Sequence, residues 1–169
     1  MPGLTPDAAF HDFFNPVQRA VRCLDSSARL GFKEVAEKLY VVSPGDGVPF
    51  AKGNATFKLF SWFNVRAIPY GDAWRVTTEQ YIHEVRNHKG ERIAAWHWHP
   101  KAPRSPIATP HLHVAADSPF CSLHYPTNRV SIEEVTRFII EELEAEPANN
   151  AWESTLQTSE QLHRKHRTW

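Results

Sequence analysis

Alternation of apolar and polar residues between positions 57 and 115 is the feature that most constrains the fold of this chain. Residues 57–67 place Phe, Leu and Val at alternate positions, and residues 74–86 are rich in β-branched and aromatic residues. Residues 91–99 follow a hairpin loop at 87–90, and a further short strand is expected at 111–115. A period of two is typical of strands with one buried face, so the pattern predicts a small, mostly antiparallel, four-stranded sheet.

Helix signals flank this strand-rich middle. Asn15-Pro16-Val17-Gln18 is a typical helix start, Gly31 is a plausible stop, and residues 33–39 fit a second short helix, with a strand at 40–42 as the alternative for the last residues. Ser131-Ile132-Glu133-Glu134 is a capping box before an amphipathic helix, and the tail from Ala148 predicts one more helix. The 169 residues suit one α+β domain, helical over 1–42, with a sheet over 54–116 and C-terminal helices over 131–166.

Composition excludes some classes of function. The 19 basic and 19 acidic residues cancel, which argues against a broad basic surface for nonspecific nucleic-acid binding. The two cysteines, Cys23 and Cys121, form no disulfide framework or metal motif. No signal peptide is visible, and no apolar run approaches the ~20 residues that span a bilayer. We therefore expect a cytoplasmic protein that does not act at a membrane.

Histidines mark the candidate functional site. Of the 10 histidines, five fall between residues 97 and 124, as His97-Trp98-His99, His111-Leu112-His113 and His124. Alternate residues of a strand point the same way, so each His-x-His pair places both imidazoles on one face. Imidazole titrates near neutral pH and is also the commonest metal ligand in proteins. The cluster therefore predicts either acid–base chemistry or metal binding.

Hairpin geometry predicts which residues share the face of the histidines. If Arg86 lies opposite Glu91, then Tyr81 lies opposite Trp96 and Gln80 opposite His97. His97 and His99 would then share a face with Ile82, Glu84, Ile93 and Ala95. Sequential strands are usually neighbours, so we also expect the two His-x-His strands to pair.

Acid–base chemistry on RNA is the first hypothesis for the cluster. Cleavage of RNA without a metal needs a base, an acid and a cation that stabilises the phosphorane charge. Under this hypothesis the protein has no metal cofactor. Exposed bases would stack on aromatic rings. The candidate catalytic residues are His97, His99, His111, His113 and Arg92, and the candidate substrate-binding residues are Arg104, Trp96, Trp98, Tyr81 and His124.

Metal-dependent catalysis is the alternative enzyme hypothesis. His97, His99, His111 and His113 would then bind zinc or another divalent transition metal, or two histidines would act with Glu84 or Asp117 as the carboxylate. The flanking residues match no familiar metal motif: no glutamate follows the first pair, and no HExxH is present. A third hypothesis is a non-enzymatic interaction module that uses an exposed aromatic surface.

One part of the chain resembles a known family. It comprises Tyr81-Ile82-His83-Glu84-Val85, the run Gly90-Glu91-Arg92-Ile93-Ala94-Ala95-Trp96-His97-Trp98-His99-Pro100, and Pro110-His111-Leu112-His113-Val114. Together, within residues 78–145, these segments are similar to the TumE-type toxins of bacterial toxin–antitoxin modules. The resemblance implies an α+β toxin that acts on RNA and is neutralised by a DNA-binding antitoxin. His111 and His113 are the positions that it carries over most directly, with His97 and His99 after them.

Overall fold

The structure is a computed structural model that describes residues 3–100, 107–115 and 117–166. It has the predicted α+β class, but the sheet has eight strands, so the predicted four-stranded sheet is wrong. The elements in chain order are α1 (Pro6–Val21), β1 (Gly31–Ala36), β2 (Leu39–Ser43), β3 (Val48–Lys52), β4 (Ala55–Tyr70), β5 (Ala73–Arg86), β6 (Arg92–Trp98), β7 (His111–Val114), β8 (Tyr125–Pro126), α2 (Ile132–Glu141) and α3 (Trp152–His166).

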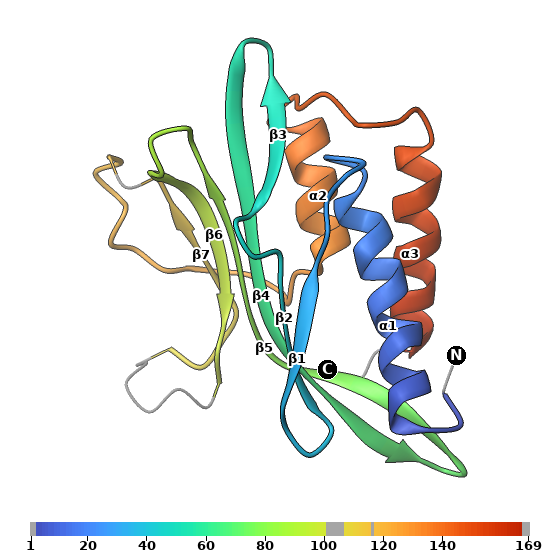
Figure 1. Ribbon diagram of the computed structural model, residues 1–169. Coiled ribbons are helices and arrows are strands. Elements are labelled where there is room, and N and C mark those ends of the chain that lie inside the picture. Colours follow the sequence, from blue (N-terminus) through green and yellow to red (C-terminus); the bar gives the residue numbers. More distant parts are fainter. Residues whose placement is uncertain (1–2, 101–106, 116, 167–169) are drawn as a thin grey trace.

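The sheet is antiparallel throughout, in the order β1-β2-β4-β5-β6-β7-β8, and β3 pairs with part of β4. Figure 1 shows the three helices side by side against one face of the sheet, with β6 and β7 at the far edge. The four strands predicted from alternation correspond to β4, β5, β6 and β7, and the predicted helices near residues 132 and 152 are α2 and α3. The additional strands are β1, β2 and β3, before the predicted sheet, and the short β8.

The N-terminal part differs most from the sequence prediction. The first helix begins at Pro6 because the Thr5 side chain accepts a hydrogen bond from the Ala8 backbone N–H, and Pro16 lies inside the helix rather than at its start. Residues 33–39, predicted as a helix, form most of the β1–β2 hairpin instead. Lys38 has a positive φ of 58° in the turn of this hairpin, a conformation that a helix does not allow. The strand alternative at 40–42 is confirmed by β2.

Large apolar side chains fill the space between the helices and the sheet. Phe10 of α1 stacks on Tyr40 of β2 with ring centroids 4.0 Å apart, and Trp96 of β6 meets Phe138 of α2 edge-on at 5.2 Å. The capping box at Ser131 is formed as predicted, with both of its hydrogen bonds present. No helix among the described residues has the length and apolar character needed to cross a membrane.

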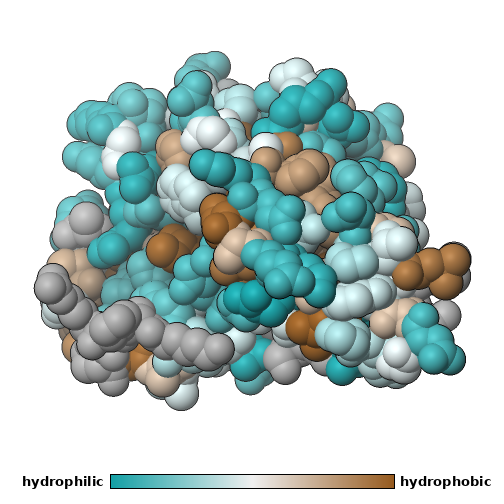
Figure 2. Space-filling model, turned by 60° about the horizontal axis from the view of Figure 1, so that its bottom comes forward, coloured by the Kyte–Doolittle hydropathy of each residue, from teal (hydrophilic) through white to brown (hydrophobic). Residues whose placement is uncertain are grey.

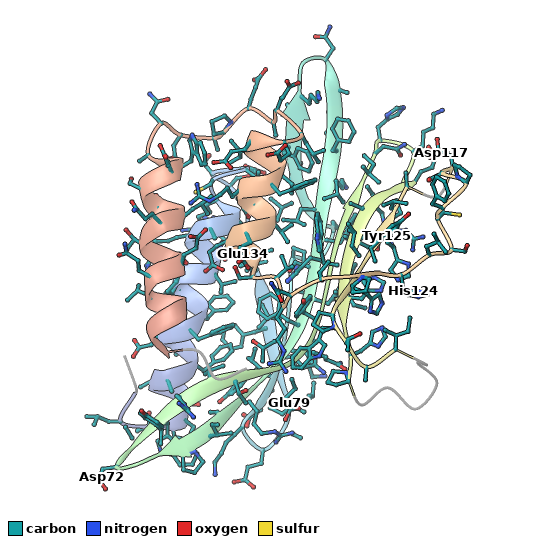
Figure 3. The ribbon with its side chains drawn as sticks, turned by 180° about the vertical axis from the view of Figure 1, so that it is seen from behind. Asp72, Glu79, Asp117, His124, Tyr125 and Glu134 are labelled. Atoms are coloured by element: carbon teal, nitrogen blue, oxygen red, sulfur yellow. The ribbon has the colours of Figure 1, made fainter. Side chains whose placement is uncertain are left out.

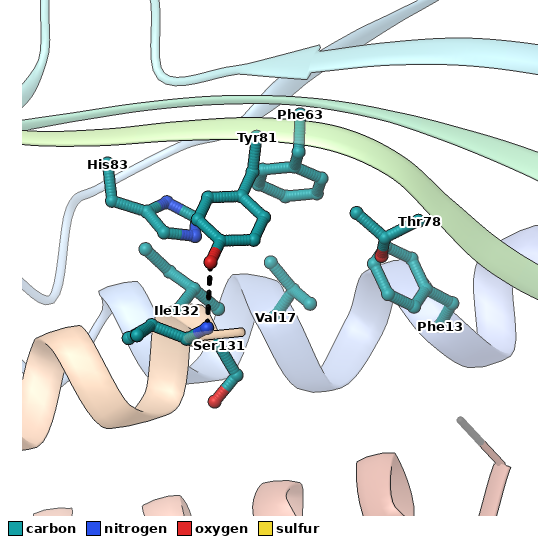
Figure 4. A pocket seen from close by; sticks show the side chains of 9 residues that line it. Phe13, Val17, Phe63, Thr78, Tyr81, His83, Ser131 and Ile132 are labelled. Atoms are coloured by element: carbon teal, nitrogen blue, oxygen red, sulfur yellow. Dashed lines mark hydrogen bonds between the residues drawn. The ribbon is translucent and has the colours of Figure 1, made fainter. Parts of the chain in front are cut away.

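The hydroxyl of Tyr81 anchors the chain just before α2. It accepts a hydrogen bond of 2.9 Å from the backbone N–H of Val130, beside a small pocket between α1, the sheet and the start of α2 (Figure 4). The Tyr81 side chain is 2% exposed, so a lost acceptor would not be replaced freely by solvent. This bond ties the sheet to the segment that returns from the histidine cluster.

We predict that Tyr81→Phe lowers the free energy of unfolding by about 1–3 kcal/mol, because it leaves the Val130 N–H without this acceptor. Chemical denaturation monitored by circular dichroism measures the change. Tyr70→Phe is the matched control, since Tyr70 is 51% exposed and loses the same atom, and its effect should stay within about 0.5 kcal/mol. Equal effects of the two substitutions would contradict the anchoring role of Tyr81.

Candidate metal centre

The register of β6 and β7 brings the two His-x-His pairs together. His97 lies directly opposite His111, and His113 lies opposite Ala95 in the same antiparallel pair. The imidazole centroids of His97 and His113 are 4.7 Å apart, and those of His97 and His111 are 5.6 Å apart. The expectation that these two strands are neighbours is thereby confirmed. We call the side of the sheet that carries these rings the histidine face.

The predicted β5–β6 register is wrong by two residues. His97 lies opposite Ile82 rather than Gln80, and Trp96 lies opposite His83 rather than Tyr81. Because side chains alternate with a period of two, this shift leaves Ile82, Glu84 and Ala95 on the histidine face as expected. Ile93 is the exception, because it is the extra residue of a β-bulge and packs against the core.

The segment after β7 runs back along the sheet and brings His124 next to His111 and His113. The chain pairs again with β7 through β8, and the Thr127 N–H donates to the Pro110 carbonyl at 3.0 Å. His124, one residue before β8, consequently lies 4.4 Å from His113 and 4.9 Å from His111 between ring centroids. Figure 3 shows His124 on this returning segment, with Asp117 at a distance from it. His99 completes the group, 5.5 Å from His111 and 5.9 Å from His97.

Three of the five imidazoles are arranged so that they could share a metal ion. One ring nitrogen each from His97, His111 and His113 lies within 4.8 Å of the other two. A tetrahedral zinc site with Zn–N bonds of ~2.0–2.1 Å needs these nitrogens about 3.4 Å apart, so the rings would move slightly inward on binding. Nδ1 of His111 lies 2.9 Å from the Thr109 carbonyl oxygen, to which it donates, leaving Nε2 as the available lone pair. Such a backbone carbonyl is the usual outer-shell partner of a metal-bound histidine.

The environment keeps these imidazoles neutral. Burial lowers the pKa of His97 to about 3, and so does electrostatic repulsion between a protonated His97 ring and the adjacent basic groups of His113, His111, His99 and Arg92. Burial, followed by electrostatic repulsion from the adjacent basic groups of His124 and Arg92, lowers the pKa of His113 to about 4. The pKa of His111, which is 2% exposed, is also lowered by burial. At neutral pH these three rings therefore offer lone pairs rather than protons.

The remaining predicted site residues are divided between the two faces of the sheet. Arg92 lies at the start of β6, near enough for its charge to act on His97 and His113. Tyr81, Trp96 and Trp98 lie on the opposite face, buried in the core, so the structure does not bring these rings to the histidines. Arg104 lies outside the described residues.

The carboxylates suggested as metal ligands have other positions. Glu84 is on the histidine face, but it forms an ion pair of 2.9 Å with Arg86.

The Thr109 carbonyl is a functional group that sequence reasoning missed, and no side-chain pattern could have revealed it because it is a backbone atom.

We predict that the metal-free protein loses stability as the pH falls from about 6.5 toward 5. The folded-state pKa values of His97 (about 3) and His113 (about 4) lie below the ordinary value of 6.5, so the unfolded chain takes up protons first. The contribution of these two neutral rings to the free energy of unfolding is complete above pH 6.5. It is lost as the pH falls toward their folded-state pKa values. Urea denaturation in a chelator, between pH 7 and 5, measures this slope above the main carboxylate range.

A double variant isolates the two histidines. His97→Gln combined with His113→Gln should flatten the dependence of unfolding free energy on pH over this range, because glutamine does not titrate. An unchanged slope in the double variant, or a flat profile in the parent protein, would contradict the assignment of buried neutral imidazoles.

Comparison of the chain with protein-family models, curated protein sequences and solved structures finds no significant match. The site is therefore defined by its geometry: two paired strands bring the imidazoles together, a backbone carbonyl fixes the ring of His111, and burial keeps His97 neutral.

Proposed function

We propose that the protein is a metal-dependent enzyme in which His97, His111 and His113 hold one divalent transition metal, with zinc as the best fit. The observation that carries this proposal is the convergence of three ring nitrogens within 4.8 Å of one another. An all-imidazole donor set suits zinc and neighbouring transition metals, whereas magnesium and calcium prefer oxygen ligands. Three protein ligands with an open fourth position are typical of catalytic rather than structural zinc sites.

The protonation state of the cluster favours a metal over metal-independent cleavage of RNA. A general acid must carry its proton at the working pH, and a pKa of about 3 for His97 or 4 for His113 leaves almost none of either ring protonated at pH 7. A metal needs the opposite, because only a neutral imidazole can donate its lone pair. The metal-independent ribonuclease, the resemblance to TumE-type toxins and the antitoxin partner stay predictions.

The two remaining histidines are placed to assist a reaction at the centre. A bound divalent metal with an open position polarises a substrate oxygen and lowers the pKa of a bound water. His124 is exposed, and its ring centroid lies 4.9 Å from that of His111 and 4.4 Å from that of His113, which places it between the centre and solvent. His99 lies on the other side of His111 and His97 and has a buried Nδ1 without a hydrogen-bond partner among the described residues.

The distribution of aromatic residues argues against an interaction module. That hypothesis expects a contiguous exposed aromatic patch and histidines directed into the core. In the structure, Trp96 and Trp98 are buried among core residues, while the histidines lie on the opposite face of the sheet. The molecular face in Figure 2 is mainly hydrophilic, with hydrophobic residues in separate small patches. The burial of Trp96 and Trp98 argues against these two rings as a docking surface, and the exposed apolar side chains near His124 are Phe120, Leu123 and Tyr125.

We predict that protein purified without a histidine tag binds one zinc ion per chain, measured by elemental analysis after dialysis and by competition with a chromophoric chelator. His113→Ala removes one of three ligands, and we expect it to weaken zinc binding by more than the ~10–100-fold that loss of an outer-shell partner costs. His111→Ala should have the same effect.

His88→Ala is the control for the zinc measurement, since His88 lies exposed in the β5–β6 turn, away from the cluster. It should bind zinc with the affinity of the parent protein. Circular dichroism establishes that each variant is folded. A parent protein without stoichiometric metal, or folded ligand variants with unchanged affinity, would overturn the proposed function.

A further inference from the structure

Arg92 is a cation on the histidine face with no ion-pair partner among the described residues. The bulge at Ile93 turns Arg92 to this face, where it lies directly opposite Arg86 of β5. Within the part of the chain that the structure describes, its Nε is buried and has no hydrogen-bond partner. A buried guanidinium N–H that lacks an acceptor costs free energy, and a bound anion would satisfy it.

The arginine opposite differs in having a carboxylate partner, although its Nε, like that of Arg92, is buried without a hydrogen-bond partner among the described residues. Arg86 donates from Nη2 to Glu84 at 2.9 Å, and its guanidinium carbon lies 4.9 Å from the centre of the Phe60 ring. Glu84, the carboxylate on the histidine face beside this pair of arginines, is therefore taken by Arg86, and the neighbouring Glu91 accepts a hydrogen bond from the Asn87 side chain. Arg92 is left as the unneutralised charge next to the histidines, near enough to lower the pKa of both His97 and His113.

The charge of the centre with a bound divalent metal also favours an anionic ligand. All three proposed ligands are neutral imidazoles, so a divalent ion would keep its full charge, and Arg92 would add one more. A site with this much positive charge is complementary to an anion rather than to a neutral or cationic group. Arginine also binds the paired oxygens of phosphate and carboxylate groups with two parallel N–H donors.

We propose that the substrate of this centre carries an oxyanion, a phosphate or a carboxylate, which is held between the open metal position and the guanidinium of Arg92. This inference rests on the proposed metal-dependent function and adds the chemical class of the substrate. Arg92 would position the anionic group, while His97, His111 and His113 hold the metal.

The test measures anion binding to the zinc-loaded protein by isothermal titration calorimetry, with inorganic phosphate and acetate as probes. Both are compared in the parent protein, in Arg92→Gln and in Arg92→Lys. We expect at least one probe to bind the parent protein, and Arg92→Gln to weaken that binding about 10-fold or more, as expected for a lost charge-assisted hydrogen bond. Arg92→Lys should restore part of the affinity, since lysine keeps the charge but not the paired donors.

Arg86→Gln is the matched control, because it removes an arginine from the same face that is already paired with Glu84. Its anion affinity should stay within about twofold of the parent value, and the zinc content of all variants should remain one per chain. Tighter binding of phosphate than of acetate assigns a phosphate substrate, and the reverse order assigns a carboxylate.

Unchanged anion affinity in zinc-loaded Arg92→Gln, or equal losses in the Arg92 and Arg86 variants, would overturn this inference and leave the metal centre standing. Absence of anion binding by the zinc-loaded parent protein would also overturn this inference and leave the metal centre standing. A parent protein that binds no zinc would overturn the proposed function and this inference together.

Discussion

The pairing of β6 with β7 is the constraint on which the site depends. With His97 directly opposite His111, two strands present four imidazoles on one face, and Ala95 beside them leaves room for the ring of His113. A slip of one residue in either strand would turn its His-x-His pair into the helix-covered core and its apolar neighbours outward. The burial of Trp96 and Trp98 on the core side therefore holds the histidines in place on the other.

The position of His97, His111 and His113 on the face of the sheet opposite the core also explains their lowered pKa values. The histidine face has few counter-charges, since Glu84 is paired with Arg86 and the rings of the cluster are surrounded by other bases. Desolvation and repulsion from adjacent basic groups oppose protonation of His97, His111 and His113, so these three rings stay neutral where the pKa of an isolated histidine would let it begin to charge. Because the folded-state pKa values of His97, His111 and His113 are lowered, these rings oppose folding as the pH falls, and such a local conflict is typical of a functional site.

The sequence allowed much of this site to be predicted, and the reasons are physical. Alternation located β4 to β7, and the period of two assigned His97, Ile82 and Glu84 to one face even though the predicted register was wrong by two residues. The bulge at Ile93, which turns Arg92 toward the histidines, was not predictable from the hairpin loop alone. Neither was the return of His124, because that position depends on the pairing of β8 with β7 across a long connection. The β1–β2 hairpin was missed because a short apolar and charged run such as 33–39 fits either helix or strand.

The most direct test of the central claim is the location of the metal in crystals of the zinc-loaded protein, from anomalous diffraction at the zinc absorption edge. The account predicts a single strong peak with a ring nitrogen from each of His97, His111 and His113 at ~2.0–2.1 Å. Nε2 should be the ligand atom of His111, because its Nδ1 donates to Thr109. A peak at other residues, or none between β6 and β7, would contradict it.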